Sequence, residues 1–343
     1  MGERIDRSGG LEPAKDFYFA ARPDDEQMRE SASAWVFDDA GAIALPRLGI
    51  EAVADRWDAR GIQVNVAFPD GRAVVVRDLG EGRSPVDDDG ICRTFASGGL
   101  TFRCDEPFVR HIVTYEGAAL DTTSEALALA PFPDAEQVPL AIEVELTSVL
   151  PPWVSGTLTE EAKQLFNEGF AGAFISPRYE QLCTAEGSVR VGGDEWTIRG
   201  TALRIHRQGP RDVTTFWGHC WPSALFPSGR GFGALAFPPR PDGEPTFNEG
   251  FVFDGGRMIP ATLVDAPWLR RLQPTGDDVS LTLRTADGDV RIEGETIASA
   301  CMPGNWNPEF TPALQQAGAR YRWDGEESIG MIERSIPTDQ LEG

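Results

Sequence analysis

Residues 178–254 contain the side chains whose types and spacing are best suited to chemistry. Two of the three histidines, His206 and His219, and two of the nine tryptophans, Trp217 and Trp221, lie in one short stretch of this segment. Imidazole groups can donate and accept protons, and aromatic rings can line an apolar pocket. The segment therefore predicts a pocket in which an apolar ligand meets a few convergent polar groups.

The elements that must position these side chains are β-strands. Apolar and polar residues alternate over 62–68 and 140–146, and turns such as Asp70-Gly71 and Asp287-Gly288 join neighbouring segments. We count roughly 16–20 strand-like segments, a number typical of antiparallel barrels or sandwiches. Helical signals are few: the clearest covers 157–166, and a weaker one covers 311–317. The pattern predicts a mainly β protein with few short helices.

The strand pattern divides the chain into two β units with a connector between them. We expect an N-terminal β domain over 1–155, a helical connector over 156–177 and a C-terminal β domain over 178–343. Residues 1–30 have the composition of a flexible end.

Composition excludes several classes of function. The chain of 343 residues has a net charge of −23, which disfavours binding to nucleic acid or to an anionic membrane surface. Five scattered cysteines without a C-x-x-C pair suit a reducing cytoplasm and indicate neither a disulfide framework nor a structural zinc site. Apolar runs stay shorter than the ~18 residues of a membrane span. We expect a cytoplasmic protein without a metal site.

Several motifs resemble one family. Arg211-Asp212 followed by Trp217-Gly218 is similar to the signature of the lipocalin-like carotenoid hydratases (hydroxyneurosporene synthases) and their AttH-like relatives. Here Val213 replaces the histidine that usually follows the aspartate, and His219 comes just after Trp-Gly. The segment 319–334, which ends in Glu333-Arg334, resembles the family's final strand. The N-terminal half is similar more diffusely, through Trp35 to Asp38, Val113 to Gly117 and Pro151 to Trp153.

The resemblance implies two consecutive lipocalin-like β-barrels with an apolar ligand between or inside them. It also implies chemistry without a cofactor, such as hydration of isolated double bonds in terpenoids or isoflavonoids, or the shaping of polyenes for pericyclic ring closure. We therefore expect a lyase or isomerase, with hydration or dehydration the best specific reaction. The substrate would be a hydrophobic unsaturated molecule such as a terpenoid, steroid or polyketide.

Hydration of an unactivated alkene needs a strong proton donor in a dry pocket, aromatic faces near the carbocation, and a group that positions water. We assign Asp212 as the acid and His219 or His206 as its partner, with Glu180 as a further catalytic candidate. Glu333 is either an inward carboxylate or a surface charge. The remaining candidates are expected to contact ligand: Trp217, Trp221, Tyr179, Arg207, Arg211 and Glu249.

Charge along the chain adds a hint about the substrate. The stretch from Arg199 to Arg211 holds four arginines and no acidic residue before Asp212. A neutral substrate, or one with a carboxylate or other anionic tail near Arg207 or Arg211, suits this strip better than a cationic one. A non-catalytic carrier of an apolar ligand is the main alternative, and a homodimer formed through the second barrel is another.

Overall fold

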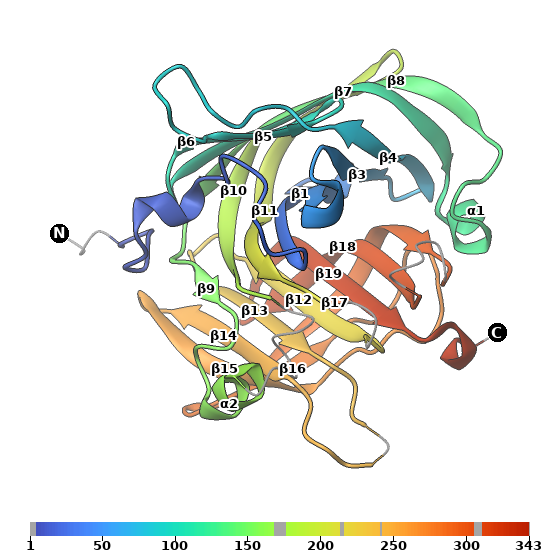
Figure 1. Cartoon of the computed structure of the whole chain (residues 1–343). Helices are drawn as coiled ribbons and strands as arrows, with labels where there is room; N and C mark the ends of the chain where they lie inside the picture. The colour runs from blue at the N-terminus through green and yellow to red at the C-terminus, as the bar shows by residue number, and fades with distance from the viewer. Residues whose placement is uncertain (1–4, 168–175, 213–215, 241, 305–310, 343) are drawn as a thin grey trace.

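A computed structural model describes residues 5–167, 176–212, 216–240, 242–304 and 311–342. Strands dominate it, and the prediction of a mainly β fold with two β units and few short helices is confirmed. Figure 1 shows the two units packed against each other, with the earlier part of the chain in one and the red and orange strands in the other.

The first unit is a large antiparallel sheet in the order β4-β3-β2-β1-β11-β10-β8-β7-β6-β5, with β9 paired to β10. An additional pairing of β4 with β7 brings the sheet round on itself. Its strands are β1 (Met28–Asp38), β2 (Ala44–Val53), β3 (Ala59–Ala67), β4 (Arg72–Glu81), β5 (Thr94–Ser97), β6 (Leu100–Glu106), β7 (Arg110–Thr123), β8 (Glu136–Ser148), β9 (Trp153–Val154), β10 (Arg178–Val191) and β11 (Asp194–Pro210).

The second unit is a closed antiparallel barrel in which each strand pairs with the next. Its strands are β12 (His219–Leu225), β13 (Gly231–Ala236), β14 (Asn248–Asp254), β15 (Arg257–Asp265), β16 (Leu281–Thr285), β17 (Gly288–Met302), β18 (Ala313–Trp323) and β19 (Glu326–Ile336). The helices are short: α1 (Ser124–Leu129), α2 (Glu160–Asn167) and the 3-10 turns η1 (Pro13–Asp16), η2 (Ala54–Arg56) and η3 (Thr338–Gln340).

The division between the sheets does not coincide with the expected boundary at residue 178. β10 and β11 belong to the first sheet, where β11 pairs with β1 and β10 pairs with β8. The expected connector does contain α2, although residues 168–175 lie outside the described segments. Short-range hairpin signals cannot show this, because the partners of β10 and β11 lie far away in the sequence.

Two further expectations about local structure are wrong. Residues 313–317 begin β18 and do not form a helix, because hydrogen bonding to β17 and β19 on both sides outweighs the weak helical signal. The segment before residue 30 is not loose throughout, since Asp16 is fully buried and Tyr18 is 7% exposed, although most residues from 20 to 27 are exposed. Residues 16–18 therefore belong to the packed structure.

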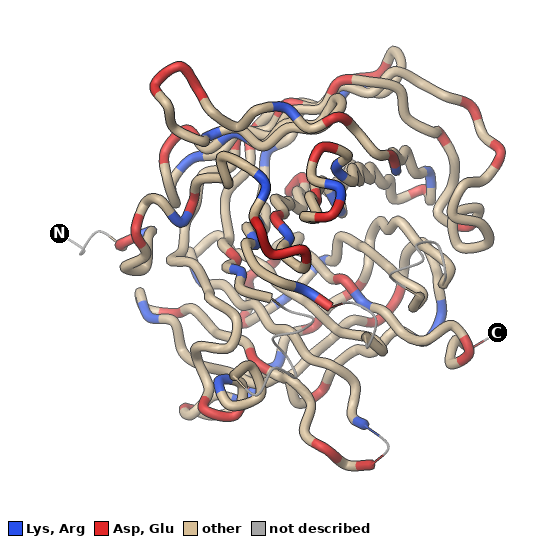
Figure 2. Tube along the Cα trace, in the orientation of Figure 1, with Lys and Arg blue, Asp and Glu red and all other residues tan. Residues whose placement is uncertain are grey.

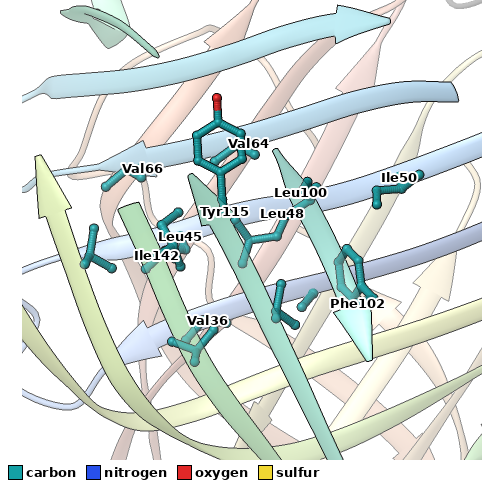
Figure 3. Close-up of a cluster of buried hydrophobic side chains, with 14 of the residues drawn as sticks. Val36, Leu45, Leu48, Ile50, Val64, Val66, Leu100, Phe102, Tyr115 and Ile142 are labelled. Carbon is teal, nitrogen blue, oxygen red and sulfur yellow. The ribbon is translucent and has the colours of Figure 1, made fainter. Parts of the chain in front are cut away.

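Three large apolar clusters fill the described part of the molecule, and a small fourth one consists of Ala73, Val75 and Leu127. The first lies inside the large sheet, where strands from opposite sides contribute residues such as Val36, Val64 and Ile142 (Figure 3). The third fills the closed barrel around Phe232 and Tyr321. The second joins residues of both sheets and so forms the contact between the two units. Because side chains alternate along a strand, β10 and β11 face the first core with one set and the second unit with the other.

Candidate functional site

Trp221 on β12 lies at the centre of the polar groups between the two units. Its indole Nε1 donates a hydrogen bond to Oε2 of Glu180 on β10, at 3.0 Å. Arg178 donates to the other carboxylate oxygen at 2.7 Å and also stacks over the Trp221 ring, 4.7 Å from its centroid. Glu180 is 3% exposed. The first sheet thus presents a buried carboxyl group to an aromatic residue of the second barrel.

Burial dominates the acidity of Glu180. Removal from water raises the pKa of its carboxyl group above the ordinary value, although Arg178 and the hydrogen bond from Trp221 act in the opposite direction. A glutamate of this kind holds its proton more readily than one on the surface. It is therefore suited to act as a proton donor.

His219, at the start of β12, forms a second polar group close to the same tryptophan. Its ring lies 6.4 Å from that of Trp221, its Nδ1 is 2.6 Å from Oγ of Ser335, and its Nε2 is 3.2 Å from Oε1 of Glu333. His219 and Ser335 are opposite each other in the pairing of β12 with β19, and Glu333 lies two residues earlier on β19. The alternation of side chains along β19 places both partners on the face that contacts the histidine.

The partners of His219 define where its protons lie. Glu333 remains ionised, since His219, Arg47 and a hydrogen bond from Gln316 hold its pKa at about 2 despite burial. A carboxylate only accepts hydrogen bonds, so Nε2 carries a proton toward Glu333. The Ser335 hydroxyl already accepts from the backbone N–H of His219 and can donate its own proton to Nδ1. The site thus contains a histidine with an ionised carboxylate at Nε2 and a hydroxyl group at Nδ1.

Residues of the first sheet complete this cluster from the opposite side. Gln316 donates to Glu333 at 2.6 Å, and its carbonyl oxygen accepts from Gln63 and Asn65 of β3 at 2.9 and 2.8 Å. The Trp35 ring meets that of Trp221 edge to face at 5.0 Å. The Glu180 carboxyl group, the His219–Glu333 pair and the two tryptophans therefore come together only when the two units pack against each other.

Tyr179 and His206, by contrast, point into the first unit. They are opposite each other in the pairing of β10 with β11, and the Tyr179 hydroxyl lies 3.3 Å from Nδ1 of His206. Tyr179 also binds Asp16, and Nε2 of His206 lies 3.5 Å from Glu30. Glu180 is the next residue after Tyr179 and faces the other way, so these two candidates are separated from the Trp221 cluster by the sheet itself.

Asp16 anchors the N-terminal segment in this interior network. Its carboxylate accepts hydrogen bonds from Tyr179 and Arg204 and lies 3.0 Å from Nε2 of His111. Cys104 is near enough that Asp16, Cys104 and His111 could together surround a metal ion. The Arg204 guanidinium already neutralises this carboxylate and would repel a cation, and burial raises the pKa of the Cys104 thiol. The arrangement fits a structural anchor better than a metal site.

The remaining sequence-based candidates lie near the end of β11 or in the segment that follows it. The side chain of Asp212 is exposed, so it does not meet the requirement of a dry pocket that its assignment as the acid carried. Arg211 pairs with Glu51 at 3.3 Å. Trp217 is partly buried, and its Nε1 donates to the backbone oxygen of Pro238. Arg207 is buried and donates to Ser31 at 3.2 Å, on the face of β11 that is turned toward the second unit.

Glu249, expected to contact ligand, instead clamps the connector. Its carboxylate accepts hydrogen bonds from Nε1 of Trp153 and from the backbone N–H groups of Gly156, Leu158 and Thr159, at 2.6–3.0 Å. Glu249 is fully buried. Both carboxylate oxygens of Glu249 accept hydrogen bonds from the segment that leads into α2, so the residue has a structural role.

Sequence reasoning missed the contribution of the first hundred residues to this cluster. Trp35 and Arg47 lie there with the Arg47 guanidinium stacked over the Trp35 ring at 4.6 Å. Pro46, inside an otherwise regular strand, was a usable signal, because proline within a strand often marks a bulge. Figure 2 shows acidic positions on the outer loops and both basic and acidic positions toward the middle of the molecule.

Comparison with known proteins agrees with this architecture. The model of the family described as Domain of unknown function (DUF7064) matches residues 13–338. The chain belongs to the DUF7064 family. No curated protein matches the sequence. Across the described segments, no helix of this family member is long and apolar enough to cross a membrane.

Solved structures show the same fold at low sequence identity. An AttH-like protein from Nitrosomonas europaea is 12% identical, with a TM-score of 0.58 over 90% of this chain and 92% of that one. Kievitone hydratase from Nectria haematococca is 10% identical, with a TM-score of 0.51 over 91% and 90%. CghA, solved with Sch210972, is 10% identical, with a TM-score of 0.52 over 91% and 89%. These likenesses confirm the expected fold.

Proposed function

We propose that this protein is a cofactor-independent hydratase or dehydratase acting on a hydrophobic, unsaturated small molecule. The observation that carries the proposal is the position of Trp221, which binds buried Glu180 through its indole N–H and lies beside the His219–Glu333 pair. Alkene hydration needs an acid, an aromatic face and a base for water, and a buried carboxyl group, a tryptophan and a histidine meet here. Kievitone hydratase, a hydratase by name, has the same fold and supports this chemistry.

In the proposed reaction, Glu180 donates its proton to one carbon of the double bond. The neighbouring carbon becomes cationic and is stabilised by the faces of Trp221 and Trp35. Water then forms the new carbon–oxygen bond and releases a proton to the Ser335 hydroxyl, whose own proton passes to Nδ1 of His219. Glu333 stabilises the resulting imidazolium, which then gives up its extra proton to solvent while Glu180 takes one back, so that both groups return to their starting states. Dehydration follows the same steps in reverse.

The assignment of roles differs from that made on sequence alone. Glu180 replaces Asp212 as the acid, because Glu180 is buried and hydrogen-bonded to an indole whereas Asp212 is exposed. Of the two histidine candidates, His219 is retained for this role. Arg207 stays a candidate ligand contact, while Tyr179, His206 and Glu249 serve the structure.

A screen with heavy-oxygen water tests the proposal. The full-length protein is incubated with a panel of terpenoid and isoflavonoid alkenes, and mass spectrometry detects products that have gained one labelled water. We expect Glu180→Gln to abolish product formation and Asp212→Asn, the matched control, to retain it. Isomers of unchanged mass would instead favour a pericyclase, and tight binding without any product would favour a carrier. Full activity of Glu180→Gln would refute the assigned acid.

A further inference from the structure

Buried polar atoms without partners gather where β1, β2 and β3 face the second barrel. Among the described residues, Nε1 of Trp35, Nε of Arg47 and Oδ1 of Asn65 are buried and have no hydrogen-bond partner. Trp35 and Asn65 are fully buried. Such atoms are rare in folded proteins, because leaving one unpaired costs about 1–3 kcal/mol. Two of them, Nε1 of Trp35 and Nε of Arg47, are donors on residues that stack on each other, and they indicate a place that a hydrogen-bond acceptor completes.

The backbone is shaped to bring these groups together. The pairing of β1 with β2 shifts register between Ala34 and Val36, which places Trp35 in a bulge. The pairing of β2 with β3 shifts between Ala44 and Arg47 and then sets Arg47 opposite Asn65. Bulges of this kind redirect side chains and are frequent beside active sites.

Glycine at position 49 leaves room for the Arg47 side chain. A Cβ atom at this position would lie 2.8 Å from Nε of Arg47 and 3.3 Å from Oγ of Ser33. Any larger residue would push the guanidinium off the strand and away from the Trp35 ring. The stack of Arg47 on Trp35 therefore depends on two bulges and one glycine.

Charge at this place favours an anion. Arg47 forms no ion pair within 4.0 Å among the residues that the structure covers, and the nearby Glu333 carboxylate is already held by His219 and Gln316. Glu51 also lies in the electrostatic surroundings of Arg47, but its carboxylate is paired with Arg29 and Arg211, and Arg178 adds a second positive charge there. Arg47 and the side chain of Glu333 both keep some accessible surface, the latter 10%, so molecules the size of water can reach the cluster.

We propose that Trp35 and Arg47 form a subsite for the carboxylate of an otherwise apolar substrate. Both residues offer N–H donors to an anionic oxygen, and arginine is the side chain best suited to a planar carboxylate. The edge contact of Trp35 with Trp221 then directs the apolar body of the substrate toward Glu180. This inference rests on the proposed function, since it takes the same cluster as the reaction site.

The test compares two probes that differ only in their polar end. Farnesoic acid carries a carboxylate and farnesol carries a hydroxyl group on the same unsaturated chain. Calorimetric titration of the full-length protein at neutral pH should show binding of the acid at least about tenfold tighter than of the alcohol, the value expected for one charge-assisted hydrogen bond. Equal affinities, or no binding of the acid, would overturn the proposal.

Variants locate the preference. Arg47→Met should weaken binding of farnesoic acid about tenfold or more while leaving farnesol within about twofold. Trp35→Phe keeps an aromatic ring, although a smaller one, and removes the N–H; it should weaken acid binding several-fold, which covers the case in which Arg47→Met does not fold. Arg230→Met is the matched control, because Arg230 also stacks on a tryptophan, Trp323 at 4.4 Å, but outside this cluster. Equal weakening of both probes in Arg47→Met would refute the subsite.

Failure of this inference and failure of the proposed function give different results. Glu180→Gln should still bind farnesoic acid more tightly than farnesol, because it removes the proposed acid and leaves Trp35 and Arg47 in place; its loss of a negative charge beside Arg178 acts in the same direction. A preference for the acid without hydration of any alkene would keep the subsite and refute the hydratase. Hydration of an alkene, without a preference for farnesoic acid that depends on Arg47, would support the hydratase and refute the subsite.

Discussion

Replacement of Glu333 by glutamine should change stability in a way that depends strongly on pH. In the folded protein the pKa of Glu333 is about 2, against an ordinary value of 4.5. At 1.36 kcal/mol per unit, this difference corresponds to about 3 kcal/mol of stabilisation by the ionised group. Its causes are His219, Arg47 and the hydrogen bond from Gln316, which together outweigh the cost of burial.

The sign follows from the depressed folded pKa. The stabilisation is complete above pH 4.5 and is lost as the pH falls through 4.5 toward 2, with about 2 kcal/mol lost by pH 3. Glu333→Gln removes the titrating group. The variant should therefore be less stable than the wild type by about 3 kcal/mol at pH 7 and by only about 1 kcal/mol at pH 3.

Urea unfolding, followed by tryptophan fluorescence at pH 7, 5, 4 and 3, measures this difference. Glu145→Gln, which alters an exposed glutamate on β8, is the control and should match the wild type at every pH. A gap between wild type and Glu333→Gln that stays constant from pH 7 to pH 3 would refute the reasoning. It would mean that Glu333 contributes through packing and not through charge.

Three other perturbations follow from the buried contacts. Glu249→Ala leaves four donors without their acceptor and should speed cleavage of the connector at least about tenfold in limited proteolysis, with mass spectrometry locating the cuts. Iodoacetamide at pH 8 should label the native protein at Cys92 and spare the buried thiols, since burial raises the pKa of Cys183 to about 11; an intact mass with more than one adduct would contradict this. Tyr179→Phe loses its hydrogen bonds to Asp16 and His206 and should lower the free energy of unfolding by about 1–3 kcal/mol without altering farnesoic acid binding; an equal loss of binding would place Tyr179 in the site after all.

Local patterns in the sequence were sufficient to predict much of the secondary structure and the fold class. Alternating apolar residues and glycine-containing turns are set by neighbours in the chain, so the hairpins and the mainly β class could be predicted. The resemblance carried by the Arg211 to Gly218 motif pointed to the fold that the solved neighbours show. The helix at 160–167 was also predicted, from its acidic first turn. The false helix at 311–317 shows the limit of such signals, because long-range pairing decided that segment.

Composition and spacing also identified the segment that holds Glu180, His219 and Trp221. They did not show which side chains of this segment face the first core and which face the second unit. A strand directs successive side chains to opposite faces, so which face meets which unit depends on the strands packed against it. Tyr179 and Glu180 are neighbours in sequence, yet one faces Asp16 inside the first sheet and the other faces Trp221. Only the pairing of β10 and β11 with β8 and β1 decides this. Likewise, Arg47 and Glu333 are 286 residues apart in the chain and share one electrostatic environment because the two units pack together.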